Sequence, residues 1–214
     1  VNLLVALTRK VAAALDAGRT ALFTASVGGT GEPEAALTHL ADAVRAHPST
    51  NVAIVSVPGA FATLEAHKAL TAGLDVLLFS DNVPLVDEIE LKRRARSLGR
   101  LVMGPGAGTA MLSGVGLGFA NRVRTGPVGV VAAAGTGAQE VMSLLDDWGV
   151  GLTHVIGVGG RDLSAAVGGI MAESAMDALD GDAATEVILL VSKPPAPEIA
   201  RSLLGRPRSK PVVA

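Results

Sequence analysis

Short runs of Val, Ile, Leu and Ala recur along the chain, and between them apolar and polar residues follow one another with helical spacing. The runs are continuous rather than alternating, which is typical of strands buried on both faces of a parallel sheet. They lie at residues 1–7, 51–57, 74–80, 128–134 and 186–192. The helical patterns cover residues 9–25, 33–46, 61–72, 85–98, 138–148, 163–179 and 197–203. Strands in alternation with helices predict an α/β fold in which helices cover parallel sheets.

One stretch interrupts this alternation. Residues 101–121 carry no charge and contain six glycines and one proline, so we interpret them as loops around short buried strands and not as a membrane helix. The sequence RVRTGP follows at 122–127 and indicates a boundary, with a first domain at 1–124 and a second at 125–214. The sequence begins with Val, and its last residues, KPVVA, resemble the first half of a buried strand. We therefore expect a piece of a longer protein, with a truncated second domain and with neighbouring segments or chains that cover the open strands.

Composition excludes several classes of protein. The 18 Lys and Arg residues nearly balance 20 Asp and Glu residues, and without a basic cluster we expect no nucleic-acid binding. The absence of cysteine excludes disulfides, zinc–thiolate sites and a catalytic thiol. An apolar content of 49% excludes intrinsic disorder. No secretory leader pattern opens the chain, so we expect a cytoplasmic protein without a membrane segment.

Common catalytic and nucleotide motifs are missing as well. The sequence has no G-x-G-x-x-G, no Gly-Lys pair for a P-loop, no G-x-S-x-G elbow and no metal-ligand pair of histidines. Its four histidines are scattered, and we interpret them as surface or structural residues: His39, His47, His67 and His154. The order of charges in 85–98, acidic first and basic last, matches a helix dipole. The sequence thus predicts no metal site and identifies no catalytic residue.

Glycine- and hydroxyl-rich turns follow the predicted strands, at the edge where ligands bind in open α/β sheets. Turns at 58–60, 81–84 and 104–109 are expected to converge on one crevice. Gly135, Thr136 and Gly137 open the helix at 138–148, so their free N–H groups could hold a phosphate or carboxylate; the alternative is a tight strand-to-helix turn. Arg161, in the turn 157–162, could clamp an anion or only brace its loop.

The order of these turns resembles a known family. From residue 51 onward the motifs VSVPGAF, SDNVP, LVMGPGAG, VGVVAAAGTGAQEV and VIGVGGRDL resemble the α subunit of succinyl-CoA synthetase and the NDP-forming acyl-CoA synthetases. The residues of three segments resemble the FdrA branch more closely still: FSDNVPLVDEIELKRRA, IGVGGRDLS and VSKPP. The resemblance implies a Rossmann-like CoA-binding-type domain at 1–124, atypical over 1–50, and a flavodoxin-like domain of the succinyl-CoA synthetase type at 125–214.

The resemblance also implies ligands and the residues that bind them. CoA would lie against Pro58, Ser80, Asp81, Asn82, Gly104 and Gly106. Phosphate, as an acyl or carbamoyl phosphate, would bind at Gly135, Thr136 and Gly137 with Arg161 neutralising charge. A partner subunit in a homo- or hetero-oligomer is implied too.

The chain departs from the family at the reacting group. The family's phosphorylated histidine belongs to a G-H-A-G segment beyond the last residue here, and Ser192-Lys193-Pro194-Pro195 stands in place of its acidic G-E-I-G-G turn. Three functions stay open: an acid–thiol ligase subunit that handles an acyl or carbamoyl phosphate, a subunit of an oxamate carbamoyltransferase in allantoin degradation, or a non-catalytic scaffold that binds CoA or an anion.

Overall fold

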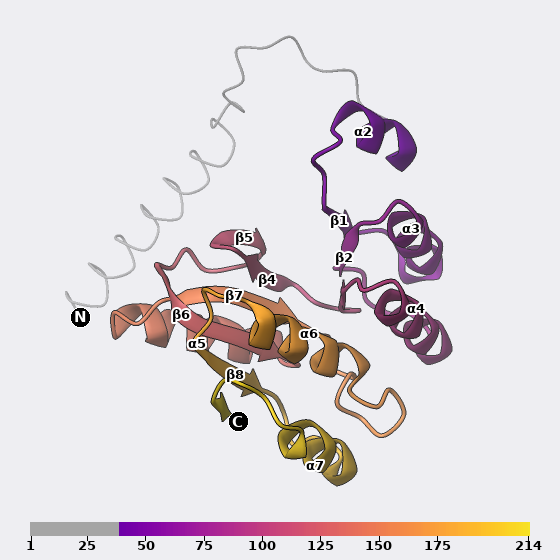
Figure 1. Ribbon diagram of the computed structural model, residues 1–214. Helices are drawn as coiled ribbons and strands as arrows, with labels where there is room; N and C mark the ends of the chain where they lie inside the picture. Colours follow the sequence, from indigo (N-terminus) through magenta and orange to yellow (C-terminus); the bar gives the residue numbers. More distant parts are fainter. Residues whose placement is uncertain (1–38) are drawn as a thin grey trace, which may run out of the picture. The chain divides into compact units, whose positions relative to one another are not determined.

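Helices and strands alternate through residues 39–214, which are the residues that the computed structural model describes (Figure 1). The helices are α2 (Leu40–Ala46), α3 (Gly59–Thr71), α4 (Leu85–Ser97), α5 (Gly135–Asp147), α6 (Ile170–Gly181) and α7 (Pro197–Gly205). The strands are β1 (Val52–Val55), β2 (Asp75–Leu78), β3 (Val102–Met103), β4 (Thr109–Leu112), β5 (Val115–Gly118), β6 (Thr125–Ala132), β7 (Leu152–Gly157), β8 (Val187–Val191) and β9 (Val212–Val213). The predicted elements at 1–7 and 9–25, and the start of 33–46, lie outside the described residues.

Two sheets are present in this part of the chain. The first is parallel, in the order β1-β2-β3, and the second has the order β5-β4-β7-β6-β8-β9. Strands β7, β6, β8 and β9 are parallel to one another, as the continuous apolar runs predict. The α/β fold with parallel sheets and covering helices is thereby confirmed.

An antiparallel edge is the feature that the sequence pattern missed. β4 runs antiparallel to both β5 and β7. Only Ser113 and Gly114 lie between the paired residues Leu112 and Val115, and both have positive φ angles, 49° and 79°. Two successive residues with positive φ make the type I′ turn that suits a tight hairpin. In the segment that we expected to be loops around short buried strands, β3 joins the smaller sheet and the β4–β5 hairpin forms the edge of the larger sheet.

Alternate residues of β6 point to two different helices. Val128, Val130 and Ala132 pack in one apolar cluster with Met142 of α5, whereas Val131 packs in a second cluster with residues of α6. Because successive side chains of a strand face opposite sides, α5 and α6 cover opposite faces of the larger sheet. α6 also contacts α4, which packs with α3 beside the smaller sheet (Figure 1). One apolar core thus extends from the smaller sheet to one face of the larger one.

The start of α6 corrects a prediction. The apolar spacing predicts a helix from residue 163, but α6 begins at Ile170. Gly168 and Gly169 have φ angles of +82° and +70°, which a right-handed helix cannot accommodate. Residues 163–169 therefore form turns, and these turns carry the chain from the loop after β7 to α6.

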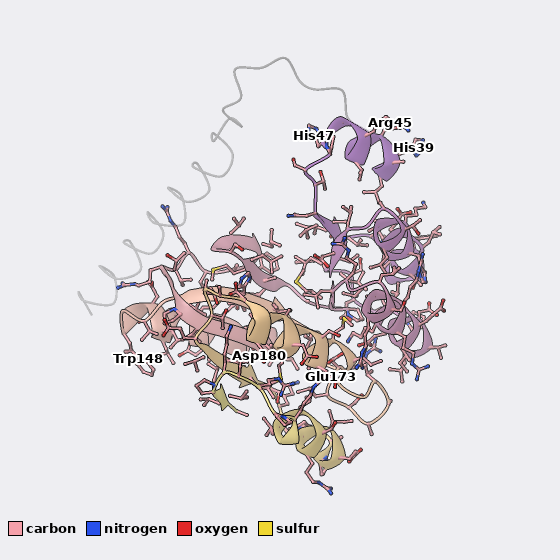
Figure 2. The ribbon with its side chains drawn as sticks, viewed as in Figure 1. His39, Arg45, His47, Trp148, Glu173 and Asp180 are labelled. Carbon is pink, nitrogen blue, oxygen red and sulfur yellow. The ribbon has the colours of Figure 1, made fainter. Side chains whose placement is uncertain are left out.

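Acidic side chains of α6 form ion pairs and hydrogen bonds with the C-terminal residues, and two of these side chains, Glu173 and Asp180, are labelled in Figure 2. Glu173 pairs with Arg206, and the Asp180 carboxylate accepts hydrogen bonds from the backbone N–H groups of Ser209 and Lys210 at 3.2 and 3.0 Å. These contacts direct the chain into β9, the last strand of the larger sheet.

The predicted boundary between residues 124 and 125 falls between β5 and β6. Both strands belong to the larger sheet, and residues 39–214 form one unit, described here by itself. The two-domain division stays a prediction. Within the same residues, no helix has the length and apolarity needed to cross a membrane.

Candidate functional site

The N-terminus of α5 is the centre of the candidate site. β6 ends at Ala132, and α5 begins three residues later at Gly135. Ala134 occupies the N-cap position and, as an alanine, offers no side chain to accept a hydrogen bond from the first turn. Gly135 and Thr136 are exposed. The first turn of this helix therefore presents backbone donors and the positive end of the helix dipole.

A cavity of about 330 Å³ lies at this helix end. Four segments, all at strand ends or in the turns beside them, contribute its walls. They supply Gly106, Ala107, Gly108, Thr109, Ala132, Ala133, Ala134, Gly135, Thr136, Ala138, Gly157, Gly159, Gly160 and Lys193. Glycine and alanine dominate, so the walls are largely backbone. An anion in such a cavity would be bound by main-chain N–H groups more than by side chains.

Lys193 is the one charged residue of that lining, and sequence reasoning did not select it. It follows β8, whose Val191 pairs with Ala132 of β6, and Ala133 N–H donates to Val191 O at 2.9 Å. The register brings Lys193 beside the start of α5. Its side chain is exposed and has no hydrogen bond or ion pair within the described residues. The signal was present in the sequence, because Lys193 follows a predicted buried strand just as Gly135 does.

The three predicted residues at the start of α5 differ in their surroundings. Gly135 and Thr136 line the cavity, but Gly137 does not. A Cβ atom on Gly137 would lie 3.2 Å from Val191 Cγ1, whereas one on Gly135 would have no neighbour within 4 Å. Gly137 therefore allows the helix to approach β8 closely, while Gly135 and Thr136 face open space.

Arg161 is placed by the structure outside the lining of the cavity. Its Nε atom lies 2.8 Å from Glu88 Oε2, and its Nη2 atom donates to Val83 O at 2.7 Å. The sequence left two roles open, an anion clamp and a brace for the loop. These contacts are those of the brace.

A group of buried ions adjoins Arg161. Lys92 is fully buried, and its Nζ atom donates to Glu88 Oε1 at 2.7 Å, to Asp162 Oδ1 at 2.8 Å and to Val158 O at 2.9 Å. The Asp162 carboxylate, also fully buried, accepts from the N–H groups of Met171 and Ala172 in the first turn of α6. We call Glu88, Lys92, Arg161 and Asp162 the ion quartet. The charge order of 85–98 matches a helix dipole but gave no sign that Glu88 and Lys92 are buried.

The residues predicted to hold CoA come together at the ends of the smaller sheet. Ser80 Oγ accepts from Val57 N–H at 2.9 Å and donates to Val55 O at 3.3 Å, and Gly106 N–H donates to Ser80 O at 3.0 Å. Asp81 Oδ1 accepts from Asn82 N–H at 2.7 Å.

Close backbone approaches complete this group of turns. A Cβ atom on Gly104 would lie 2.3 Å from Leu78 O, and Pro58 caps α3 at the neighbouring turn. Of the predicted CoA residues, only Gly106 also lines the cavity. The two predicted groups therefore meet at Gly106.

The histidines and the perturbed carboxylates lie elsewhere. None of the four histidines lines the cavity; two of them, His39 and His47, flank α2 (Figure 2). Hydrogen bonds lower the pKa of three aspartates outside the lining: the Arg124 N–H acts on Asp146, the Ser209 N–H on Asp180 and the Thr185 hydroxyl on Asp182. No group of three or more potential metal ligands occurs in residues 39–214.

Comparison with known proteins identifies the class of domain. Residues 123–214 match the family model described as the CoA binding domain. The chain is 30% identical over 175 residues to subunit alpha 1 of an ADP-forming succinate–CoA ligase from Archaeoglobus fulgidus, a match that covers 79% of this chain and 58% of that subunit. Part of the chain is thus similar to a CoA binding domain, and α subunits of succinate–CoA ligases are among the proteins that the chain resembles.

A particular relative is more similar. YahF of Escherichia coli, an uncharacterized protein, is 47% identical over 186 residues, which are 86% of this chain and 36% of YahF. The chain therefore spans between about a third and three fifths of the curated relatives named here.

Solved structures confirm the fold. An ATP citrate lyase from Methanothrix soehngenii, in complex with citrate and coenzyme A, aligns over 71% of this chain and 26% of its own, with a TM-score of 0.59 and 20% identity. The dinucleotide-forming acetyl-coenzyme A synthetase 1 of Ca. Korarchaeum cryptofilum aligns over 76% and 37%, with a TM-score of 0.54 and 23% identity. The family match begins at residue 123, whereas the residues that we predict to hold CoA precede it.

Proposed function

We propose that this chain belongs to an FdrA-type, acyl-CoA synthetase-like enzyme and binds the phosphoryl group of an acyl or carbamoyl phosphate at the N-terminus of α5. The observation that carries the proposal is the cavity at this helix end, lined by backbone and by Lys193. Its walls come from the carboxyl-end turns of β6, β7 and β8, the edge at which open α/β sheets bind ligands.

Charge supports a phosphoryl ligand in particular. The first turn of α5 offers N–H donors, and the Lys193 ammonium group can approach the same space from the turn after β8. No acidic side chain belongs to the lining. Donors that are fixed before the ligand arrives stabilise negative charge that develops on a departing phosphate. A phosphate dianion would be favoured over a neutral ligand for this reason.

The positions of the histidines bear on whether the phosphoryl group is bound covalently. Because none of them lines the cavity, the described residues hold the phosphate without a covalent bond to histidine. In the ligase form of the proposal, CoA sulfur attacks the acyl carbon, the bond from that carbon to the phosphate oxygen breaks, phosphate leaves and the thiol proton passes to solvent. In the carbamoyltransferase form, oxamate nitrogen attacks the carbamoyl carbon, the corresponding carbon–oxygen bond breaks, phosphate leaves and the nitrogen loses one proton to solvent. Gly135, Thr136 and Lys193 bind the leaving group in both forms.

CoA is the second proposed ligand, at Pro58, Ser80, Asp81, Asn82, Gly104 and Gly106. The CoA-binding domain match supports a CoA ligand for the chain, and the close packing of the three turns supports a common site. If CoA binds, millimolar CoA should raise the melting temperature by mass action. Hydrogen exchange then locates it: protection at residues 80–82 and at Gly104 and Gly106 supports the crevice, and protection confined to residues after 123 contradicts it.

The proposed protein works in the cytoplasm with a partner subunit. The succinate–CoA ligase relative is itself named as an α subunit, which supports an oligomeric partner. A transfer assay separates the functions: labelled acetyl phosphate with CoA, or carbamoyl phosphate with oxamate, is incubated with the chain alone and with the proteins encoded beside it. Transfer to CoA supports the ligase, and transfer to oxamate supports the carbamoyltransferase. No transfer in any mixture leaves the non-catalytic scaffold.

Phosphate itself tests the anion site. We expect phosphate to stabilise the chain, by about 2.7 kcal/mol at a hundred times its Kd. Thr136→Glu should abolish this stabilisation, because a carboxylate would occupy the same space and repel the anion, while Thr136 is exposed and its replacement should move the phosphate-free melting temperature by only a few degrees.

Lys193→Met should weaken phosphate binding without abolishing it, since the N–H donors remain. Lys68→Met, at an exposed lysine of α3 that pairs with Glu65, is the matched control and should bind phosphate normally. A wild-type chain that phosphate does not stabilise would remove the basis of the phosphoryl-transfer proposal.

A further inference from the structure

One wall of the cavity is formed by the end of β7 and the loop that follows it. Gly157, Gly159 and Gly160 supply this wall, and none of them has a side chain to pack. Val158 lies between them and is held from both ends: its N–H group donates to Ala132 O at 2.8 Å, and its carbonyl oxygen accepts from Lys92 Nζ at 2.9 Å. Besides the pairing of Gly157 in β7 and the burial of the Val158 side chain in the core, a side chain of α4 therefore helps to fix the position of the wall.

The space around this wall is narrow. A Cβ atom on Gly159 would lie 2.7 Å from the carbonyl carbon of Gly104, and one on Gly157 would lie 2.7 Å from Thr109 O. The loop fits between its neighbours only with its backbone close to them. A small displacement would change the shape of the cavity.

The ion quartet connects this loop to α4 and α6. Lys92 uses its three N–H donors on Glu88, Asp162 and Val158. Asp162 in turn accepts from two N–H groups at the start of α6. Glu88, Lys92 and Asp162 are each at most 1% exposed. Buried ions need their partners, so this network admits few alternative geometries.

Arg161 closes the quartet from the solvent side. Its side chain is 46% exposed, and it contacts Glu88 and Val83 O. Two cations and two carboxylates are then combined, so the group is neutral as a whole. Val83 follows Asn82, in the turn that we predict for CoA, so Arg161 ties that turn to the loop after β7.

We propose that Arg161 and Lys92 are positioning residues, which hold the loop 157–160 as the wall of the anion cavity through Glu88 and Asp162. Arg161 acts through Glu88 and does not touch the anion. The proposal rests on the proposed function to the extent that the cavity is taken to hold phosphate. Its structural part, that the quartet fixes the loop, stands apart from any ligand.

A double-mutant cycle distinguishes this role from direct binding. Arg161→Gln and Glu88→Gln should each weaken phosphate binding by about 2- to 30-fold, the range measured for residues that act through others. Combined, they should weaken it no more than the stronger single change, because both break one link. A residue that bound the anion directly would instead add its loss to that of Glu88→Gln, which would overturn the proposal. Glu88→Gln keeps an oxygen that can accept from Lys92, which favours folding.

Two further variants serve as rescue and control. Arg161→Lys can still pair with Glu88 and should recover part of the lost affinity; losses equal to those of Arg161→Gln would contradict a role for the ion pair. Arg96→Gln removes a similarly exposed arginine, whose Nη2 atom lies 2.8 Å from Glu173 Oε2. It should leave phosphate affinity unchanged, because its ion-pair partner Glu173 belongs neither to the ion quartet nor to the cavity lining.

Hydrogen exchange separates failure of the positioning role from failure of the proposed function. Without any ligand, Arg161→Gln should raise amide exchange in residues 157–162, while exchange in the strands of the smaller sheet stays at the wild-type rate. If wild type binds no phosphate but this local change occurs, the positioning role stands and the anion site fails. If wild type binds phosphate and Arg161→Gln changes neither affinity nor local exchange, the positioning role is overturned and the anion site stands.

Discussion

The turns at Gly59 and Gly135, one beside each sheet, contain glycine for different reasons. At the smaller sheet, a Cβ atom on Gly59 would lie 2.4 Å from Asp81 O, and the hydroxyl of Ser80 is used by Val57 N–H and Val55 O. At the larger sheet, Gly135 has open space where a Cβ atom would be, and it lines a cavity of about 330 Å³. Glycine lets backbone approach backbone in the first case and leaves room for a ligand in the second.

The comparison teaches that a glycine-rich turn after a strand is not enough to assign a ligand. The sequence presents both sets of turns alike, after strands and before helices. Only the surroundings of each glycine distinguish a closed turn from an open one. The proposed anion site at α5 is therefore supported by unfilled space, whereas the proposed CoA crevice is supported only by the meeting of its turns.

The largest expected effect comes from the residue that links the two regions. Lys92→Met would leave the carboxylates of Glu88 and Asp162 buried and without their shared cation. We expect a loss of about 3–5 kcal/mol in the free energy of unfolding, measured by urea denaturation. Lys68→Met, which breaks the exposed pair with Glu65, should cost less than about 1 kcal/mol. Equal losses in the two variants would contradict the importance of burial.

Two alanine substitutions test the contrast between the glycines directly. Gly59→Ala should destabilise the chain by about 3 kcal/mol, because backbone oxygens of Asp81 and Asn82 stand where the methyl group must go. Gly135→Ala has no such neighbour, and should be neutral or stabilising by about 0.4–1 kcal/mol through the unfolded state. Thermal unfolding in phosphate-free buffer measures both. The contrast fails if the two substitutions have the same sign and size.

Removal of one hydroxyl from the turns of each sheet should give a smaller difference in stability. Ser80→Ala should cost about 1 kcal/mol, because Val57 N–H would lose a partly buried hydrogen bond to the hydroxyl of the buried Ser80. Thr136→Ala removes an exposed hydroxyl and should stay within about 0.5 kcal/mol of wild type without phosphate. Chemical denaturation of the two variants in parallel is sufficient. A cost at Thr136 as large as that at Ser80 would indicate that the α5 turn is also closed by internal contacts.

The smallest expected effect is on folding stability at acidic pH. The pKa of Asp182 lies below its ordinary value of 3.8, chiefly because the Thr185 hydroxyl donates to its carboxylate, with help from the nearby His154 and Lys210. A lowered pKa stabilises the fold at pH values above the unfolded pKa, and this stability is lost as pH falls through the folded value. Asp182→Asn should therefore flatten the decline of the urea midpoint below about pH 4. Glu186→Gln, at an exposed carboxylate, should leave that decline as in wild type.

The regular elements could be predicted from apolar runs because the strands of this fold are buried on both faces. The hairpin of β4 and β5 could not be predicted in the same way. Its turn is made by Ser113 and Gly114, which both have positive φ, but the surrounding stretch contains several other glycines at which a turn was equally plausible. The early start expected for α6 followed its apolar spacing and overlooked Gly168 and Gly169.

At the candidate site, the sequence could identify residues that lie close to one another along the chain, but not residues that only the fold brings together. Gly135 and Thr136 could be selected because a strand and a helix flank them. Lys92 and Asp162 are 70 residues apart in sequence, and nothing in a single sequence links two such distant ions. Lys193 was within reach, because the parallel pairing of β6 and β8 brings the turns after both strands to one edge.

The neutrality of the ion quartet also restricts how its sequence can change over evolutionary time. Replacing one member alone passes through an intermediate with an uncompensated buried charge, and natural domains have only a small reserve of stability to absorb it. Replacing a cation together with its carboxylate, or both by apolar residues that fill the same volume, avoids this intermediate. Positions 88, 92 and 162 should therefore vary together or not at all among homologous chains, and a lineage that lost the pair would have to support the loop after β7 by other contacts.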